Sequence, residues 1–450
     1  MKNETTMKTA PAWKMLITMS LPVILIMIVN VIYNMADIYF ISQTGDAAMI
    51  AGISLAAPVF SAISAFNTLI GFGGCTAVSM ALGREDYEAV KRYSSFVVYG
   101  SVLMGLVLAG IVLAAMPVLL PFLGAAGETA VHTASYLRIL AFGSPFLVLG
   151  GALGNTIRAD GDSKNAMLVT LAGTLLNVIL DPLFITVFHM NVSGAALATV
   201  MGNVLSTVCL LRLASKKKFF SVSIRDFSMR PEVSLHILSL GLPMAAGTLL
   251  MSFSSAFGNS IVMRYGTDVI AARSIAGKVG MLTPMIIMGI DMGIQPAISY
   301  HHGAGNHERL REIVMTTLAV SVLTASLMSV GFFFGREAFM RAFVQDSGMI
   351  EIGKRFMIGG IVSAPVCALY QMCSTWLQAT GKVAKATITA LLRQGIVMVP
   401  VLFLMERMLG LNGIIWSSAV TDVIAALVGG WFCLQESRIG VQKSVHVRHA

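Results

Sequence analysis

Two aspartates lie in stretches of sequence that are otherwise apolar enough to cross a lipid bilayer. Asp37 lies in LPVILIMIVNVIYNMADIYFI, and Asp181 lies in AMLVTLAGTLLNVILDPLFITVF. A carboxylate near the centre of a bilayer costs at least a few kcal/mol, so such residues are rare and usually line a cavity or an ion pathway. These two acids are therefore the first candidates for chemistry in this chain.

The first acid ends a stripe of polar residues at helical spacing. Asn30, Tyr33, Asn34 and Asp37 fall at positions i, i+3, i+4 and i+7, which is one face of an α-helix. A polar face on an apolar helix must be buried against protein or water, because lipid cannot satisfy its hydrogen bonds. The pattern indicates the lining of an internal cavity.

The second acid ends a similar stripe, Thr174, Asn177 and Asp181. Carboxylate, amide and hydroxyl oxygens are the ligands that a hard cation such as Na⁺ prefers. Two neighbouring carboxylates in a low dielectric also titrate as a coupled pair that shares a proton. The two stripes therefore predict a buried site for Na⁺ or H⁺, and the sequence does not choose between these ions.

The composition sets the class of protein. The chain has 450 residues, of which 56% are hydrophobic and 12% are charged, and its mean hydropathy is +0.80. Soluble domains carry about twice this share of charge. The first apolar segment has no small-residue cleavage site, so we do not interpret it as a signal peptide. The fold class that we predict is an all-α polytopic membrane protein.

Twelve apolar segments divide the chain, with ends uncertain by about four residues. They fall near residues 16–40, 47–82, 93–122, 131–157, 165–189, 193–214, 237–262, 268–302, 315–343, 351–379, 386–407 and 412–435. The second and eighth are long and interrupted by Gly and Pro, which favours kinks.

The distribution of basic residues predicts the orientation. Most Lys and Arg lie in the terminal segments and alternate loops on one side, and the longest basic loop is RLASKKKFFSVSIRDFSMRPE. Positive charges near helix ends stay in the cytoplasm. We expect a multi-pass protein of the cytoplasmic membrane with both termini inside. The net charge of +9 reflects this rule and predicts no nucleic-acid partner.

The same basic loop separates two halves that repeat. A shift of 221 residues superposes Leu21 on Leu242, and a shift of 220 superposes Gly83 on Gly303. We expect an N-terminal six-helix bundle over 1–214, a cytoplasmic linker over 215–236 and a C-terminal bundle over 237–450. Two similarly oriented halves predict a pseudo-twofold axis along the membrane normal, an architecture typical of transporters.

The repeat also shows where the halves differ. At the same shifts Asp37 aligns with Gly258, and Asp181 aligns with Val401. The acids therefore belong to the first half alone. A purely structural role would more naturally have been kept in both halves, so the asymmetry favours a function in the first bundle.

The chain resembles the multidrug and toxic compound extrusion (MATE) transporters over nearly its whole length. The strings that carry the resemblance include NVIYNMADIYFI, ALGREDYEAVKR, GTLLNVILDPLFI, QPAISYHHGAGNHERLRE and WLQATGKVAKATITALLRQG. NVILDPLFI and QPAISYHHGAGN are fairly specific together. Acids in the first half resemble the DinF-like branch more than the NorM-like branch.

The resemblance implies two six-helix bundles in a V and a cation-coupled antiporter that exports drug-like, often cationic, compounds by alternating access. It implies a cation or proton site made of Asp37, Asn177, Asp181 and Thr199. It also implies a hinge at Pro22. The substrate lining that we predict comprises Asn30, Tyr33, Asn34, Asn155 and Asp291.

Three of the remaining polar residues leave alternatives open. Asp291 departs from the uncharged residue usual in the family, so it puts a one-site cavity in doubt. Asp422 either contacts substrate or pairs with a neighbouring basic residue. Asn155 precedes Arg158 and either lines the cavity or forms a hydrogen bond at a helix end.

Enzyme motifs are absent from the sequence: it contains no P-loop, zinc motif or nucleophile elbow. We expect no catalytic residues, no cofactor, no metal beyond Na⁺, and a monomer whose partners are small-molecule substrates and lipid. Two alternatives remain. A flippase for lipid-linked or polyanionic substrates would need a cavity rich in Arg and Lys, and a membrane-embedded sensor or enzyme would not need the repeat.

Overall fold

The structure is a computed structural model that describes residues 7–42 and 46–448. Within these ranges the side chains of 33–42, 47, 267 and 437–448 are not described. Every regular element in the described ranges is helical. Twelve helical segments there are long and apolar enough to cross a membrane. The all-α membrane fold with twelve spanning segments is confirmed.

The first half of the chain forms six long helices, which we call the N-lobe. Their bounds are α2 (Ala12–Ser42), α3 (Ala47–Gly83), α4 (Tyr87–Phe122), α5 (Gly127–Thr156), α6 (Ser163–Pro182) and α7 (Asn191–Ser215). A 3₁₀ turn, Ile157–Asp160, follows α5, and a π-helical turn, Leu183–Val187, continues α6. Helix α5 lies at the centre of this lobe, in contact with α3, α4 and α7.

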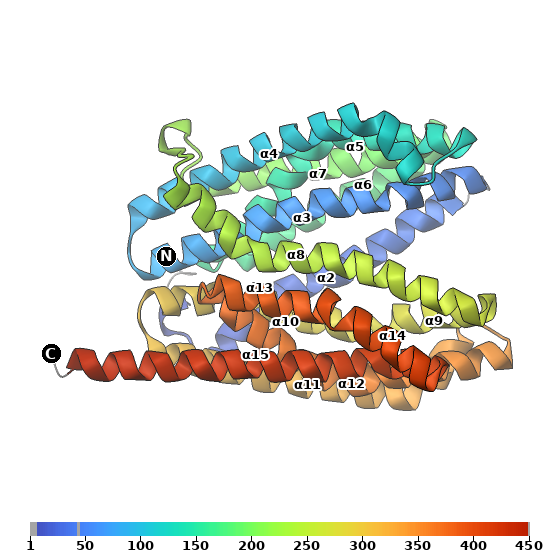
Figure 1. Ribbon diagram of the computed structural model, residues 1–450. Helices are drawn as coiled ribbons and strands as arrows, with labels where there is room; N and C mark the ends of the chain where they lie inside the picture. Colours follow the sequence, from blue (N-terminus) through green and yellow to red (C-terminus); the bar gives the residue numbers. More distant parts are fainter. Residues whose placement is uncertain (1–6, 43–45, 449–450) are drawn as a thin grey trace.

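The second half forms the C-lobe. Its helices are α8 (Pro231–Val262), α9 (Thr267–Gly280), α10 (Leu282–Gly303), α11 (His307–Arg341), α12 (Ser347–Ala379), α13 (Val383–Leu391), α14 (Met398–Leu409) and α15 (Leu411–Arg448). A π-helical turn, Leu392–Ile396, joins α13 to α14. Figure 1 shows the two lobes one above the other, with both chain ends at the same end of the molecule.

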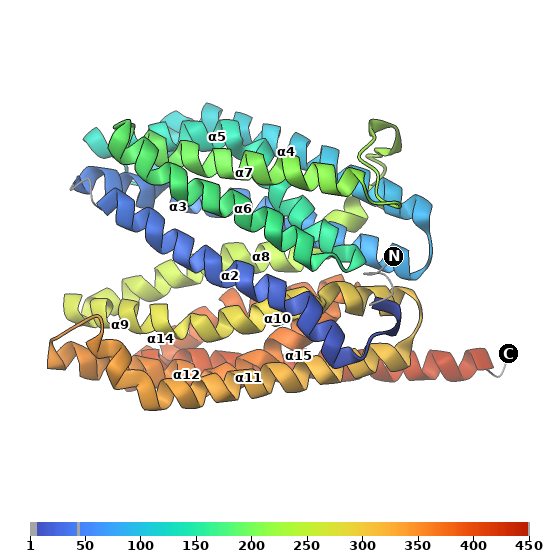
Figure 2. The ribbon, with the colours of Figure 1, turned by 180° about the vertical axis from the view of Figure 1, so that it is seen from behind.

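Two helices pass from one lobe to the other. Helix α2 begins against α10 of the C-lobe and ends against α6 of its own lobe, a diagonal path that Figure 2 shows clearly. Near its start the Ser20 hydroxyl donates a 2.8 Å hydrogen bond to the Ile290 carbonyl. Helix α8 packs on α3 and on α13. Pro22 is buried just beyond Ser20 and lies inside the continuous helix α2.

Contacts between the lobes repeat the pseudo-symmetry of the sequence. A Cβ built on Gly83 would lie 2.0 Å from the Tyr300 carbonyl oxygen, and one built on Gly303 would lie 2.2 Å from the Met80 carbonyl oxygen. The repeat aligns Gly83 with Gly303 and Met80 with Tyr300. Glycine at both positions lets the backbones of α3 and α10 touch.

The loop after α7 packs on the N-lobe. The Tyr99 hydroxyl donates to the Val222 carbonyl at 2.9 Å, and the Ser95 hydroxyl donates to the Ser223 carbonyl at 2.7 Å. The ammonium of Lys217 lies 2.7 Å from Asp160 and 2.9 Å from Asp162. This basic loop is therefore a fixed part of the N-lobe end.

The eighth predicted segment, 268–302, is one spanning segment in the structure, Asp268–Gly303, and it is interrupted at Met281, where α9 ends and α10 begins. Gly277 and Gly280 weaken the end of α9. Pro284 sits in the first turn of α10, where a missing N–H costs nothing. The interruption falls within the stretch of Gly and Pro residues from which a kink was predicted.

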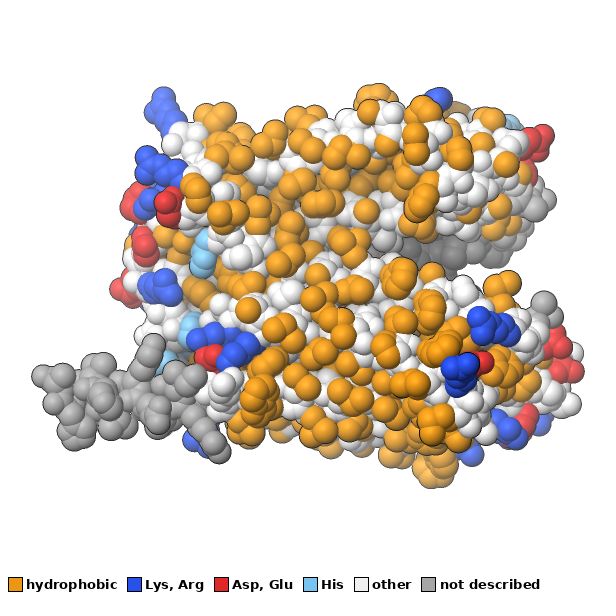
Figure 3. Space-filling model, in the orientation of Figure 1, with side chains coloured by type: hydrophobic (Ala, Val, Ile, Leu, Met, Phe, Trp, Pro, Cys, Tyr) orange, Lys and Arg blue, Asp and Glu red, His pale blue; other side chains and the backbone are white. Residues whose placement is uncertain are grey.

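The two lobes part at the end of the molecule away from the chain termini. Figure 3 shows this cleft, together with a mainly hydrophobic surface along the helices and charged side chains near their two ends. This distribution fits a bilayer around the middle of both lobes.

Candidate cation and substrate site

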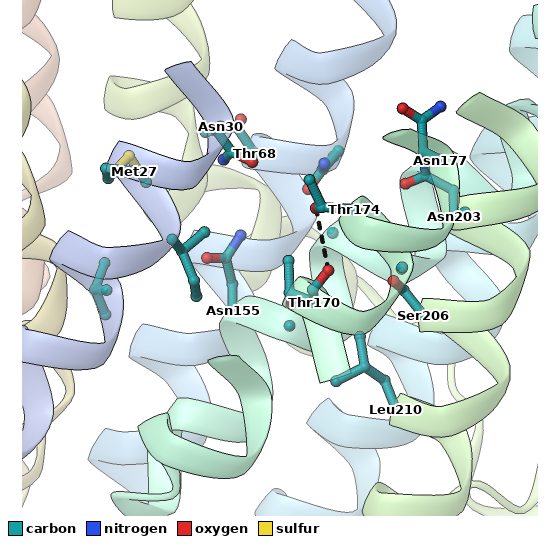
Figure 4. Close-up of a pocket in the computed structure, with 18 of the residues that line it drawn as sticks. Met27, Asn30, Thr68, Asn155, Thr170, Thr174, Asn177, Asn203, Ser206 and Leu210 are labelled. Carbon is teal, nitrogen blue, oxygen red and sulfur yellow. Dashed lines mark hydrogen bonds between the residues drawn. The ribbon is translucent and has the colours of Figure 1, made fainter. Parts of the chain in front are cut away.

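A cavity of about 410 Å³ lies inside the N-lobe. Helices α2, α3, α5, α6 and α7 line it, and Met292 of α10 closes one side. The polar lining residues are Asn30, Asn67, Thr68, Asn155, Arg158, Thr170, Thr174, Asn177, Thr199, Asn203 and Ser206. Figure 4 shows side chains from these helices turned toward one another around the space.

Five of the residues singled out in the sequence line this cavity. They are Asn30, Asn155, Thr174, Asn177 and Thr199. Asp181 lies one turn beyond Asn177 on α6 and has 0% of its surface exposed. The side chains of Tyr33, Asn34 and Asp37 lie outside the described residues, although their backbone continues the same helix as Asn30.

A hydrogen bond between α6 and α7 orients the amide of Asn177. Its Nδ2 donates to the hydroxyl of Thr199 at 3.2 Å. Its Oδ1 is buried and has no hydrogen-bond partner among the described residues. A Cβ built on Gly202 would lie 3.0 Å from the Asn177 Cβ, so the absence of a side chain lets the two helices approach. The arrangement leaves an amide oxygen available as a ligand.

Helices α3 and α5 each direct an asparagine side chain toward a glycine of the other helix. A Cβ on Gly151 would lie 1.9 Å from Nδ2 of Asn67, and a Cβ on Gly71 would lie 2.8 Å from Nδ2 of Asn155. In each pair the glycine leaves space that the asparagine of the facing helix fills. The amide Oδ1 of Asn67 is buried without a hydrogen-bond partner in the described part of the chain.

Arg158 lies at one end of the cavity. It is 5% exposed, its guanidinium donates to Oδ1 of Asn155, and its Cζ lies 5.9 Å from the Phe72 ring centroid. The two alternatives for Asn155 are thus both met, since it lines the cavity and forms a helix-end hydrogen bond. Among the described lining residues Arg158 is the one charged side chain.

The two acids of the C-lobe lie elsewhere. Asp291 is 2% exposed and does not line this cavity; its polar neighbours are the Ser321 hydroxyl and the Cys373 thiol. Asp422 forms an ion pair with Arg393 and accepts a hydrogen bond from Ser363. Of the two alternatives for Asp422, pairing with a basic residue is therefore the one present.

Several lining residues were not predicted from the sequence. They are Asn67, Thr68, Arg158, Thr170, Asn203 and Ser206. On α7, Thr199, Asn203 and Ser206 fall at i, i+4 and i+7, so the periodicity that identified the α2 and α6 stripes also marks this face. Asn67 is the one amide side chain of α3, and this periodicity did not single it out.

Comparison with known proteins identifies the family. The family model described as MatE matches residues 22–183 and again residues 243–404. The second match begins 221 residues after the first, which is the offset of the internal repeat. Together the matches span well over half of the chain.

A curated relative and two solved structures are similar over most of the chain. The multidrug export protein MepA of Staphylococcus aureus is 32% identical over 420 residues, 93% of this chain and 92% of its own length. An outward-facing multidrug resistance MATE family transporter of the MOP superfamily superposes with a TM-score of 0.91, at 24% identity and 99% coverage of each chain.

The other solved structure is a MOP superfamily transporter of Pyrococcus furiosus, described as having a binding pocket of reverse polarity. It superposes with a TM-score of 0.88, at 25% identity over 98% of this chain and 99% of its own. Because one fold serves pockets of different polarity, the substrate must be argued from side chains. The two family-model matches and the MepA similarity show that the chain belongs to the MATE family of membrane transporters.

Proposed function

We propose that this transporter exports drug-like organic cations across the cytoplasmic membrane in exchange for Na⁺ or H⁺. MepA, a relative along almost the whole chain, is named a multidrug export protein. A partly apolar cavity of about 410 Å³ has the size and mixed lining that suit drug-sized ligands. Flexible methionines such as Met27 and Met292 on its wall suit a site that accepts several shapes.

The observation that carries the proposal is the environment of Asp181. Its side chain is fully buried one helical turn from Asn177, whose amide oxygen has no hydrogen-bond partner among the described residues. A buried carboxylate needs a proton, a cation or strong hydrogen bonds. We assign the coupling ion to Asp181, Asn177 and Thr199, joined by Asp37 from α2.

Coupling follows from the position of this site behind the cavity wall. Asn177 and Thr199 belong to both the proposed ion site and the cavity lining. A proton or Na⁺ that neutralises the acids weakens the attraction for an organic cation in the cavity. Neutralisation also removes the need for water around the acids, so the outer half of α2 can repack, with the hinge near Pro22.

The proposed orientation places both termini in the cytoplasm. The loop with Lys216, Lys217 and Lys218 then faces inside, as the positive-inside rule expects. The cleft between the lobes (Figure 3) opens at the opposite end, so this conformation is the one that releases substrate outside.

The flippase alternative is not favoured by the cavity. A site for a pyrophosphate or a polyanion would need several basic side chains. Arg158 is the one basic residue among the described lining residues, and its guanidinium is already bonded to Asn155.

The experiment is dye transport in proteoliposomes. Purified protein in vesicles should move ethidium, an organic cation, when a Na⁺ or pH gradient is imposed, and not without one. Ethidium movement that is the same with and without either gradient would contradict coupling, and the absence of movement in all conditions would contradict export of organic cations.

A further inference from the structure

A second cavity lies entirely within the C-lobe. Its volume is about 360 Å³, and α9, α11, α12, α14 and α15 supply most of its wall. Its apolar wall includes Phe332, Phe356, Met357, Met398, Ile414 and Ile415. It shares no lining residue with the N-lobe cavity.

Arg273 of α9 is the one charged residue in the described lining of this second cavity. Its Nη1 is buried and has no hydrogen-bond partner among the described residues. The ion pairs of the described chain do not include it. A guanidinium without a counter-charge inside a membrane protein is costly, so an anion bound beside Arg273 would stabilise it.

Arg273 lies against a glycine of the neighbouring helix α8. A Cβ built on Gly258 of α8 would lie 2.9 Å from Nη2 of Arg273. The repeat aligns Gly258 with Asp37, and the same 221-residue shift aligns Arg273 with Gly52. The acid of the first repeat therefore has a glycine as its counterpart in the second, and the arginine of the second repeat has a glycine as its counterpart in the first.

We infer that the C-lobe cavity binds an amphipathic organic anion, whose carboxylate or sulfonate contacts Arg273. Guanidinium groups bind planar oxyanions through paired hydrogen bonds. The hydroxyls of Thr283 and Ser418 line the same space and add polar partners. Phe332, Phe356, Met357 and Met398 enclose the apolar body. This site is additional to the proposed export of cations and does not depend on it.

The test compares two dyes that share an aromatic body. 8-Anilinonaphthalene-1-sulfonate carries a sulfonate, whereas N-phenyl-1-naphthylamine has the same rings without the charge. Fluorescence titrations use the purified full-length protein in phosphatidylcholine nanodiscs, with empty discs subtracted. Arg273→Met should weaken binding of the anionic dye by about tenfold or more, as expected for the loss of a charged hydrogen bond, and should leave the neutral dye unchanged.

Three further variants complete the design. Arg273→Lys keeps the charge but loses the paired hydrogen bonds, so its affinity for the anionic dye should lie between those of the parent and Arg273→Met. Arg264→Met removes an exposed arginine from the neighbouring turn and should change nothing. Asp181→Asn should also leave dye binding unchanged, so failure of the proposed export mechanism is distinguishable from failure of this site.

Three results would overturn the inference. The first is an affinity for the anionic dye that is the same in Arg273→Met as in the parent. The second is an equal fall in the affinities for both dyes, which would indicate loss of the fold around the cavity. The third is displacement of the anionic dye by phosphatidylglycerol in the discs of the parent but not of Arg273→Met, which would assign Arg273 to a lipid headgroup.

Discussion

Nδ2 of Asn177 donates a hydrogen bond to the Thr199 hydroxyl at 3.2 Å, so the amide nitrogen faces α7. With the nitrogen held by α7, the oxygen Oδ1 remains buried without a hydrogen-bond partner among the described residues. Asp181 follows one turn later on α6. An amide oxygen and a carboxylate thus stand in sequence along one helix face, which is the basis for the ion site proposed above.

Neutralising the proposed ion site should uncouple transport. Asp181→Asn and Asp37→Asn remove the two carboxylates while keeping side-chain volume, so we expect gradient-driven ethidium export to fall to background with near-normal expression. Export is lost in both variants because coupling requires a carboxylate that a proton or Na⁺ can neutralise. Dye efflux from energised vesicles measures this.

Asp291→Asn is the matched control, because it removes a buried carboxylate from the other lobe, away from the cavity. Export by this variant is expected within about twofold of the parent, since no interaction of the ion site is lost. Parent-like export by both Asp181→Asn and Asp37→Asn would show that the ion site is elsewhere.

Filling the space beside Asn67 should reshape the N-lobe cavity. Gly151→Ala places a Cβ 1.9 Å from the Asn67 amide, so that side chain must move. Overpacking of this kind costs about 1–3 kcal/mol of folding stability. Because the displaced Asn67 lines the cavity, we also expect the affinity for tetraphenylphosphonium to fall. Isothermal titration calorimetry of the purified protein measures this affinity.

Gly110→Ala is the control for that substitution. Gly110 lies on an exposed face of α4 with nothing within 4 Å of a built Cβ. Binding and melting temperature should both stay at parent values. An unchanged affinity in Gly151→Ala would mean that Asn67 does not shape the ligand site.

Removing one lysine should loosen the loop between the lobes. Lys217 bridges Asp160 and Asp162 and its side chain is 11% exposed. Lys217→Met leaves two neighbouring carboxylates without their counter-charge, a loss of about 1–3 kcal/mol. We expect a lower melting temperature in detergent. Lys216→Met, at an exposed position of the same loop, should have the melting temperature of the parent. Equal melting temperatures of Lys217→Met and Lys216→Met would rule out a structural role for the bridge.

The orientation can be tested with two single cysteines. Lys216→Cys should resist impermeant maleimides in intact cells and react after lysis, because basic loops stay in the cytoplasm. Gln345→Cys, exposed in the loop between α11 and α12, should react in intact cells. The parent, with its five native cysteines, sets the background. The opposite labelling pattern would invert the proposed topology.

Much of the fold could be predicted because hydrophobic length determines membrane spans. The repeat was also visible, since the glycines that touch across the lobes, Gly83 and Gly303, recur at a fixed offset. The sequence predicted a kink in the eighth segment, but neither the residue at which the helix breaks, Met281, nor the π-helical turns could be predicted in the same way. Local helix geometry changes there while the apolar pattern continues.

The site was predictable where polar residues recur on one face. Asn30, predicted to line the cavity, does so, and Asn177 and Thr199, predicted as cation ligands, line it too. Asn67 was missed because its role depends on Gly151, a residue of a different helix that leaves the space it fills. Asp291 was assigned to the substrate lining from its charge alone, and the structure places it between helices of the other lobe. Pairings across helices require the three-dimensional structure.

The central claim is that one site in the N-lobe links ion and drug, and drug binding to the purified protein tests it most directly. The affinity for tetraphenylphosphonium is measured across pH, with and without Na⁺, in the parent and in Asp181→Asn. Linkage requires that ion and drug weaken each other by the same factor, and linked sites usually couple by about 1–3 kcal/mol. The account predicts weaker drug binding in the parent as H⁺ or Na⁺ rises, and little dependence in Asp181→Asn. Parent affinity that is independent of both pH and Na⁺ would contradict the claim.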